Sequence, residues 1–560
     1  MNCQELKIFC VNNNKSYNFK GGETLLDILN RVGTEIDFKP ICALVNNKVE
    51  GLQFPLYVPK TINFIPLDSA AGNRVYIRSL CMLLFKSIKE KYPNLTLRIE
   101  HSISKGYYCR LFQEENLFEI TERFISEISV SMREDVKKNI DFVPHDILKD
   151  EAIEIFKKEN LNAKVKLFKT QSELYVSVYS LSDIYDSYYG PLVPSTGYLD
   201  IFKIEKYQEG FLLLGPDPKN YFVAQTSVVQ KKMFQAFTEY LSFNKIIGVR
   251  NIGELNMAVR KGKSSDLINV AEALHAKKIS SIAQDIAERY RMGGARIVLV
   301  AGPSSSGKTT TAQRLAIYLI TNLLKPVTIS LDNYFVNRDR TPLDEYGEKD
   351  YEHIEALDLK TFNEHLNALL NGEEVEMPYY NFELGKRTYR GDRIKLGDNG
   401  IILIEGIHGL NPRLTQEIDE KMKYRLYVSA LTTLSIDDHN WIPTTDNRLL
   451  RRIIRDYKYR GTSARETIQR WPSVRRGEEK WIFPFQENAD MTFNSSLLFE
   501  LAVMKEYGET ILKQVPNDCI EYAEAYRLRK FLSYFDSIPD NLIPPTSLLR
   551  EFLGGSSLNY

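Results

Sequence analysis

The sequence predicts a multidomain α/β protein whose largest sheet is parallel and carries helices on both faces. From residue 295 onward, apolar strand-like runs alternate with helical segments, which is the order typical of a parallel sheet. Before residue 293 the pattern differs, because a short β-rich unit precedes a region that mixes helices and strands. A chain of 560 residues has room for about three or four domains.

Composition narrows the functional classes. Hydrophobic residues make up 43% and charged residues 26%, as in soluble globular proteins. Lys+Arg and Asp+Glu number 73 each, so net charge gives no argument for nucleic acid or an anionic membrane as the main partner. The six cysteines, Cys3 among them, include no CxxC pair, which favours reduced thiols. The sequence shows neither a signal peptide pattern nor a membrane helix, and we expect a cytoplasmic protein.

The β-rich unit spans residues 1–67. A helix is expected from Thr24 to Val32, and strands are expected around 41–45 and 62–65. The Asn46-Asn47 pair between these strands is a turn signal.

The next region, 68–235, predicts an α+β domain. Helical patterns cover 79–91 and 150–159, 174–179 is strand-like, and GPLVPSTG (190–197) is a Pro/Gly-rich loop.

Three further segments complete the organisation. Residues 236–292 are expected to form a helical connector, most clearly from Ala271 to Tyr290. Residues 293–520 form the predicted parallel α/β domain, and 521–560 a helical tail.

A phosphate-binding loop opens the α/β domain. The apolar run from Ala295 to Ala301 predicts a strand buried on both faces, and GPSSSGKT follows it before a helix. This is GxxxxGK[ST] between strand and helix, typical of P-loop NTPases. The alternative is a Gly/Ser turn that precedes a helix by chance. Nine residues are expected to bind ATP: Gly302, Pro303, Ser304, Ser305, Ser306, Gly307, Lys308, Thr309 and Thr310.

The chemistry of this loop is phosphate binding. Its backbone N–H groups and the start of the helix attract phosphate oxygens. Lys308 is expected to reach the β- and γ-phosphates, and the Thr309 hydroxyl to bind Mg²⁺.

Two acids follow later strands. Asp332 comes directly after 327–331, where a carboxylate can accept a proton from an attacking hydroxyl. The alternative is a helix N-cap. Glu405 ends the strand 401–404 and is expected to hold Mg²⁺, the alternative being an acid without a partner.

An arginine-rich helix is predicted over 446–456. Its basic residues share one face: Arg448, Arg451, Arg452 and Arg455. With Arg460, which follows, they suit a lid over transferring phosphate, and a solvated basic face is the alternative.

Together these motifs resemble the uridine kinase/phosphoribulokinase family from about Ala295 to about Asn494. SLDNYF matches the segment of the catalytic base, so the resemblance assigns that role to Asp332. IEGIHGL matches the segment of the Mg²⁺-associated acid, Glu405. Arg455 and Arg460 match lid contacts to phosphate, which act with Lys308 in catalysis.

The resemblance also implies a nucleoside pocket. DYEHIEALD places Tyr351 against the base and Glu352 at the ribose hydroxyls, and Arg452 matches a ribose contact. MPYYNF places Tyr380 and Phe382 along the base.

Four positions depart from uridine–cytidine kinases. Glu352 stands for Asp, Gly385 for the base-reading His, Thr462 for a second lid Arg, and Arg470 for a base-contacting Gln. These changes bear on base choice. We therefore predict transfer of the ATP γ-phosphate to the 5′-hydroxyl of a nucleoside, with another nucleoside or a sugar phosphate as the alternative substrate.

The N-terminal half has its own resemblance. Residues 1–67 look like a TGS domain, a β-grasp module, and residues 68–235 resemble the second additional, editing domain of threonyl-tRNA synthetase, best at GPLVPSTG. The metal positions of that domain hold other residues here: Arg78, Met82, Tyr188 and Leu192. We therefore expect no zinc. The region 68–235 could then serve as a ligand-sensing module, an RNA-binding module or a purely structural one.

A nucleotide-regulated tRNA- or RNA-binding protein is the rival function, because TGS domains also occur in GTPases. A GTPase should carry NKxD after the phosphate loop, but Asn244-Lys245 lies before it.

Overall fold

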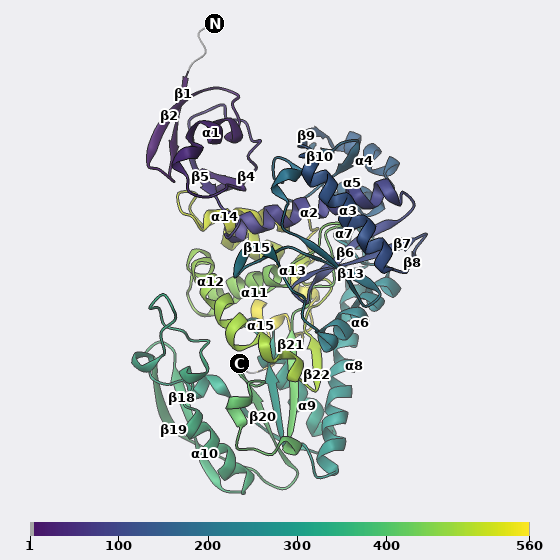
Figure 1. Ribbon diagram of the computed structural model, residues 1–560. Coiled ribbons are helices and arrows are strands. Elements are labelled where there is room, and N and C mark those ends of the chain that lie inside the picture. The colour runs from purple at the N-terminus through teal and green to yellow at the C-terminus, as the bar shows by residue number, and fades with distance from the viewer. Residues whose placement is uncertain (1–4, 559–560) are drawn as a thin grey trace.

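The computed structural model describes residues 5–558, so Cys3 lies outside the described part of the chain. It shows several sheets along the chain, with the β-grasp unit at one end of the molecule and a long hairpin at the other (Figure 1). The described cysteines are free and buried: Cys10, Cys42, Cys81, Cys109 and Cys519. Among residues 5–558, no helix combines the length and the apolarity that a membrane crossing needs.

The first unit is a five-stranded mixed sheet with one helix. Its elements are β1 (Glu5–Cys10), β2 (Lys15–Lys20), α1 (Leu25–Val32), β3 (Cys42–Val45), β4 (Lys48–Glu50) and β5 (Thr61–Ile65). The strand order is β2-β1-β5-β3-β4, and the central pair β1 and β5 is parallel, as in a β-grasp fold. Thr24 caps α1 in a capping box with Asp27. Asn46 and Asn47 both adopt positive φ, which confirms the predicted turn.

The second region combines one long helix with a five-stranded, a three-stranded and a two-stranded sheet. Its helices are α2 (Ala70–Lys91), α3 (Glu122–Lys138), α4 (Lys149–Lys158) and α5 (Asn162–Thr170). Its strands are β6 (Thr96–Ile103), β7 (Gly106–Gln113), β8 (Asn116–Leu117), β9 (Phe142–Leu148), β10 (Tyr175–Leu181), β11 (Ile184–Asp186), β12 (Lys203–Tyr207), β13 (Gly210–Leu214), β14 (Pro216–Asp217) and β15 (Asn220–Ala224). α2 is longer than the predicted 79–91 and starts where Ser69 caps it. It is buried on every side through its middle, so it lacks the amphipathic pattern that marks a helix in a sequence.

Three helices follow: α6 (Lys231–Ile247), α7 (Ile252–Arg260) and α8 (Ser264–Arg291). α8 covers the helix predicted from Ala271 to Tyr290 and packs along the parallel sheet. Its buried residues, such as Ile282 and Ile286, share one core with Val298 and Val300. The helical segment is thus part of the layer that covers the sheet.

The parallel α/β domain contains the site. Its elements are β16 (Ile297–Ala301), α9 (Lys308–Thr321), β17 (Lys325–Ser330), the short 3₁₀ helix η3 (Leu331–Tyr334), α10 (Leu359–Leu370), β18 (Glu374–Asn381), β19 (Lys386–Lys395), β20 (Gly400–Glu405), β21 (Lys423–Ser429), α11 (Thr444–Tyr459), α12 (Ala464–Trp481), β22 (Met491–Asn494) and α13 (Glu500–Leu512). The sheet order is β17-β20-β16-β21-β22, and all neighbours are parallel. Val298 faces α8 and α9, whereas Leu299 faces the core that contains α10, so both faces are covered.

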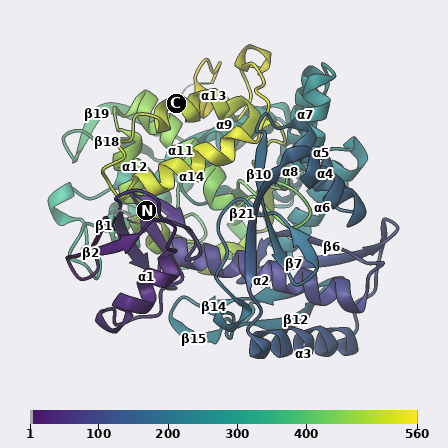
Figure 2. The same cartoon turned by 90° about the horizontal axis from the view of Figure 1, so that it is seen from above.

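The tail forms α14 (Tyr522–Ser533) and α15 (Arg550–Leu553). α14 lies next to the β-grasp unit in both views (Figures 1 and 2), and its Glu524 pairs with Arg74 of α2 at 3.0 Å. Lys48 of the β-grasp unit lies 4.6 Å from the Tyr526 ring centroid. The tail therefore contacts both N-terminal units before it returns to the α/β domain.

Candidate active site

The phosphate loop joins β16 to α9 at the carboxyl edge of the sheet. Gly307 precedes α9 with φ of +82°, a conformation that favours glycine. A Cβ on Gly302 would lie 2.0 Å from the Val428 carbonyl oxygen, so the backbone of β21 excludes any side chain there. The turn thus needs glycine twice, at Gly307 for its positive φ and at Gly302 for the close approach of β21.

Two buried ion pairs brace this loop. Glu478 accepts the Ser304 N–H at 3.1 Å, and the Arg448 Nε donates to the Ser304 carbonyl at 2.9 Å. Arg448 also pairs with Glu478, and Arg451 pairs with Glu500. Both arginines are fully buried. The expectation that they face solvent or belong to a lid is therefore wrong, because neither side chain is free to move over a bound phosphate.

Lys308, Thr309 and Glu405 lie together at the mouth of the loop. Glu405 Oε2 is 3.5 Å from the Thr309 hydroxyl, and Glu405 Oε1 accepts from the Ser330 hydroxyl at 2.8 Å. Burial and the nearby Asp332 carboxylate raise the pKa of Glu405 to about 7, and the Lys308 charge opposes this rise. Glu405 thus has partners, and the alternative of an isolated strand-end acid is wrong.

Asp332 lies in η3, directly beyond the end of β17. Ser330 caps this short helix, so the reading of Asp332 as an N-cap is wrong. Burial lowers the pKa of Lys308, and the Asp332 charge opposes this shift. The charge of Arg455 is the main cause that lowers the pKa of Arg460 to about 10, and Asp332 opposes that shift too. The acid therefore lies among the phosphate-loop lysine and the arginines of α11.

Three exposed or half-buried arginines converge at the end of α11. Asp456 pairs with Arg452 at 3.3 Å, with Arg455 at 2.9 Å and with Arg460 at 3.5 Å. Arg452 also donates to the Ser304 hydroxyl at 2.8 Å. Arg452 therefore borders the loop, and Asp456 holds Arg455 and Arg460 beside Arg452.

The residues expected to bind the nucleoside lie beyond Asp332. The Tyr380 and Phe382 rings pack 5.1 Å apart, and both contact Phe335, at 5.6 and 6.3 Å between ring centroids. Tyr380 is buried, whereas Phe382 and Tyr351 are 54% and 41% exposed. Phe335, Tyr380 and Phe382 thus form one aromatic cluster, in which the Phe382 ring is open to solvent.

Glu352 packs against α12. A Cβ on Gly477 would lie 2.4 Å from the Glu352 Cβ, so this glycine permits the close approach. Burial raises the pKa of Glu352 to about 7, and Arg452 opposes the rise. The carboxyl predicted to bind ribose therefore lies near the arginine predicted to do the same.

Sequence reasoning missed Glu478, Asp456 and Ser330, which orient the predicted residues. Ser330 stands at the end of a strand, a position that could have drawn attention. Glu478 lies in a run of charged residues (RRGEEK) that gives no sign of its burial.

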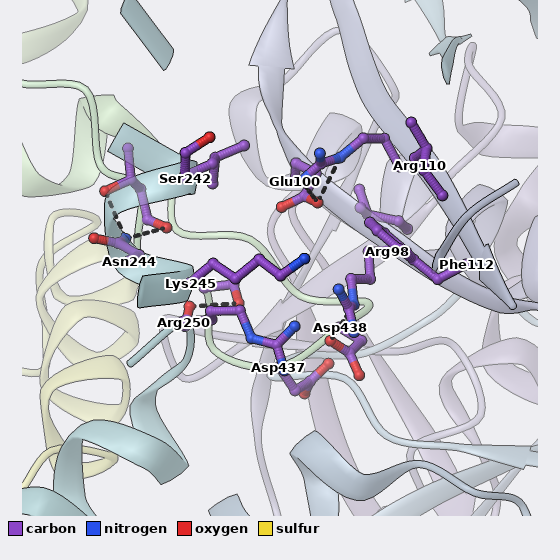
Figure 3. A pocket seen from close by; sticks show the side chains of 15 residues that line it. Arg98, Glu100, Arg110, Phe112, Ser242, Asn244, Lys245, Arg250, Asp437 and Asp438 are labelled. Carbon is purple, nitrogen blue, oxygen red and sulfur yellow. Dashed lines mark hydrogen bonds and ion pairs between the residues drawn. The ribbon is translucent and has the colours of Figure 1, made fainter. Parts of the chain in front are cut away.

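A cavity of about 200 Å³ lies elsewhere, between β6, β7, α6 and the 433–438 segment (Figure 3). None of the predicted site residues lines it. Its arginines already have carboxylate partners, since Arg98 pairs with Glu115 and Arg110 with Glu100.

Comparison with known proteins gives two regions of similarity. The family model "Phosphoribulokinase / Uridine kinase family" matches residues 297–497. Uridine kinase from Halalkalibacterium halodurans is 30% identical over 196 residues, which cover 35% of this chain and 83% of that kinase. Uridine kinase from Halobacterium salinarum is 29% identical over 194 residues, 34% of this chain and 76% of that kinase.

The N-terminal region resembles a different enzyme. Threonine–tRNA ligase from Desulforamulus reducens is 29% identical over 184 residues, 33% of this chain but only 28% of the ligase. Among structures, D-glycerate 3-kinase from Cryptococcus neoformans has 11% identity and a TM-score of 0.21 over 46% of this chain and 87% of that kinase.

Proposed function

The chain belongs to the phosphoribulokinase/uridine kinase family, and we propose that it transfers the γ-phosphate of ATP to the 5′-hydroxyl of a nucleoside. One observation carries the proposal. Lys308, Thr309, Asp332 and Glu405 come from three different segments and meet at the carboxyl edge of one parallel sheet. Ligands of such sheets bind at this edge.

The reaction needs a base, a charge clamp and a metal. Asp332 would accept the proton of the attacking hydroxyl. Lys308 and the loop amides would hold the triphosphate, while Arg455 and Arg460 would stabilise charge on the transferring group.

Magnesium fits the donors at this edge. Among residues 5–558 no group of three or more His, Cys, Asp or Glu side chains is arranged to hold a metal. Mg²⁺ commonly takes one or two protein oxygens and completes its shell with water and nucleotide phosphates. Thr309 and Glu405 supply that sparse protein coordination, and the ion would neutralise phosphate charge during transfer.

A nucleoside is favoured over other alcohols by the aromatic cluster of Phe335, Tyr380 and Phe382, because rings stack on a base. The identity of the base is tested by a panel. The purified protein would be incubated with Mg²⁺-ATP and uridine, cytidine, adenosine, guanosine, ribulose 5-phosphate or glycerate. A nucleoside 5′-monophosphate identified by mass is the expected product. Phosphorylation of the sugar phosphate or glycerate alone would contradict the proposal.

The N-terminal units support a second candidate role, binding of tRNA. The observation in its favour is the similarity to threonine–tRNA ligase. We infer TGS-like and editing-like domains over 1–67 and 68–235, a helical segment over 236–292, the kinase over 293–520 and a tail over 521–560. Gel-shift titration with tRNA at several salt concentrations tests this role, and a steep salt dependence is expected. Equal, weak binding of tRNA and unrelated polyanions would exclude it.

We further infer that the editing-like unit holds no zinc. Arg78 of α2 donates to the Pro191 carbonyl at 3.1 Å, and a Cβ on Gly190 would lie 2.5 Å from its guanidinium. A buried cation thus lies against Gly190 and Pro191, between Tyr188 and Leu192 in the sequence, and zinc prefers His and Cys ligands.

A further inference from the structure

The last helix among the described residues, α15, lies against the phosphate loop. Oε2 of Glu551, in α15, accepts hydrogen bonds from the Thr310 hydroxyl at 2.5 Å and from the Thr310 backbone N–H at 3.3 Å. Leu548 approaches from the same segment, because a Cβ on Gly307 would lie 2.7 Å from it. The tail therefore touches both the loop and the first turn of α9.

The Thr310 donors are part of the surface that a phosphate loop offers to a nucleotide. Thr310 is the third residue of α9, so its N–H belongs to the first turn, where N–H groups point toward capping groups or ligands. The positive end of the helix dipole adds attraction for an anion at this point. A carboxylate and a phosphate are both anions and need the same donors, so one excludes the other.

We propose that Glu551 is a further residue of the nucleotide site, whose carboxylate takes the Thr310 donors in the empty protein and must be displaced by a phosphate of the incoming nucleotide. This inference rests on the proposed binding of ATP by the loop. Glu551 then competes with the nucleotide for the Thr310 donors. This competition lowers the affinity for ATP and favours ligands with enough phosphate charge to displace the carboxylate.

The segment around Glu551 is held by the helix that carries the lid arginines. Lys458 donates to the Leu553 carbonyl, and the Arg451 guanidinium carbon lies 5.1 Å from the centroid of the Phe552 ring. Leu548 and Phe552 are fully buried. Removing the segment would therefore expose core residues, whereas turning the half-exposed Glu551 side chain away would remove only its contact with Thr310, at little structural cost.

The same stretch of chain reaches the N-terminal units. Its earlier helix, α14, pairs with Arg74 of α2 through Glu524 and contacts Lys48 of the β-grasp unit through Tyr526. The tail thus connects the N-terminal units physically to the donors of the phosphate loop.

Calorimetric titration tests the proposal on the full-length protein. Glu551→Ala and the isosteric Glu551→Gln are compared with wild type, and Glu506→Gln, at an exposed acid of α13, is the matched control. We expect the Kd for ATP and for ADP to fall about tenfold in Glu551→Ala, since one charge-assisted contact no longer competes. The fall should be smaller in Glu551→Gln, whose amide oxygen still accepts. Adenosine, which lacks phosphate, should bind equally to all four proteins.

The outcomes separate this inference from the proposed function. Unchanged or weaker ATP binding by both Glu551 variants, with thermal unfolding like that of wild type, would overturn the competitor role. If Glu551→Ala unfolds, Glu551→Gln alone decides by the same criterion. Failure of wild type and every variant to bind ATP would instead refute the nucleotide site itself.

Discussion

Replacing Arg448 by Met should destabilise the kinase region, because the ion pair that braces the phosphate loop is buried. The Arg448 and Glu478 side chains are 1% and 0% exposed, and Glu478 also accepts the Ser304 N–H. Removing one partner of a buried pair costs about 3–5 kcal/mol, since the other charge stays buried. Arg475 remains 2.9 Å from Glu478, which favours the lower end, about 3 kcal/mol.

Thermal denaturation followed by circular dichroism measures this cost. At roughly 2–4 °C per kcal/mol, the Tm of the kinase transition should fall by about 6–12 °C. Arg470→Met, at an exposed position of α12, is the control and should change little. Adding Glu478→Leu to Arg448→Met should recover part of the loss, because no buried charge is then left unpaired. A Tm of Arg448→Met within about 1 °C of wild type would refute the bracing role.

Four further predictions concern the loop and the nucleoside pocket. Because burial raises the pKa of Glu352 to about 7, this carboxyl is protonated below that pH and ionised above it. The KM for the nucleoside should therefore fall as pH rises through about 7, and Glu352→Gln should lose this dependence. An unchanged pH profile in the variant would contradict the assignment of Glu352 to the ribose. With this raised pKa, Glu352 keeps a proton in the folded protein that the unfolded chain releases above pH 4.5. The contribution of Glu352 to the free energy of unfolding therefore falls as pH rises, and urea titration at pH 5 and pH 8 measures it. Gly307→Ala should weaken ATP binding at least tenfold in calorimetry, because a left-handed residue costs about 1–2 kcal/mol and the new Cβ meets Leu548; wild-type affinity would show that the turn tolerates the change. Phe382→Ala should raise the nucleoside KM severalfold with Tm unchanged, since the ring is 54% exposed, whereas Tyr380→Ala should lower Tm as well; equal Tm losses would contradict this division.

Much of the kinase fold follows from local patterns. β16 and β20 are continuous apolar runs buried on both faces, and the Gly-Lys-Thr loop between strand and helix has few structural solutions. For the same reason the sequence could place Lys308, Thr309, Asp332 and Glu405 at one sheet edge, because parallel strands end at the same side.

The rest depended on contacts between distant segments. The spacing of Arg448 and Arg451 suggests an exposed face, but Glu478 and Glu500 come from other helices and neutralise both in the core. The sequence pattern predicts α2 only from residue 79, because the helix lacks an amphipathic stripe that would mark its start at Ala70. Nothing in the sequence near Glu551 indicates a contact with Thr310, which is 241 residues away along the chain.

The central claim is that Asp332 activates the attacking hydroxyl beside a bound triphosphate. Asp332→Asn and the exposed control Asp339→Asn should be compared by calorimetric ATP binding and by steady-state phosphoryl transfer to the best nucleoside of the panel. We predict ATP affinity within about twofold of wild type and turnover reduced by about 10²- to 10⁴-fold in Asp332→Asn alone, the range for loss of a general base. Turnover near that of wild type in Asp332→Asn would contradict the account.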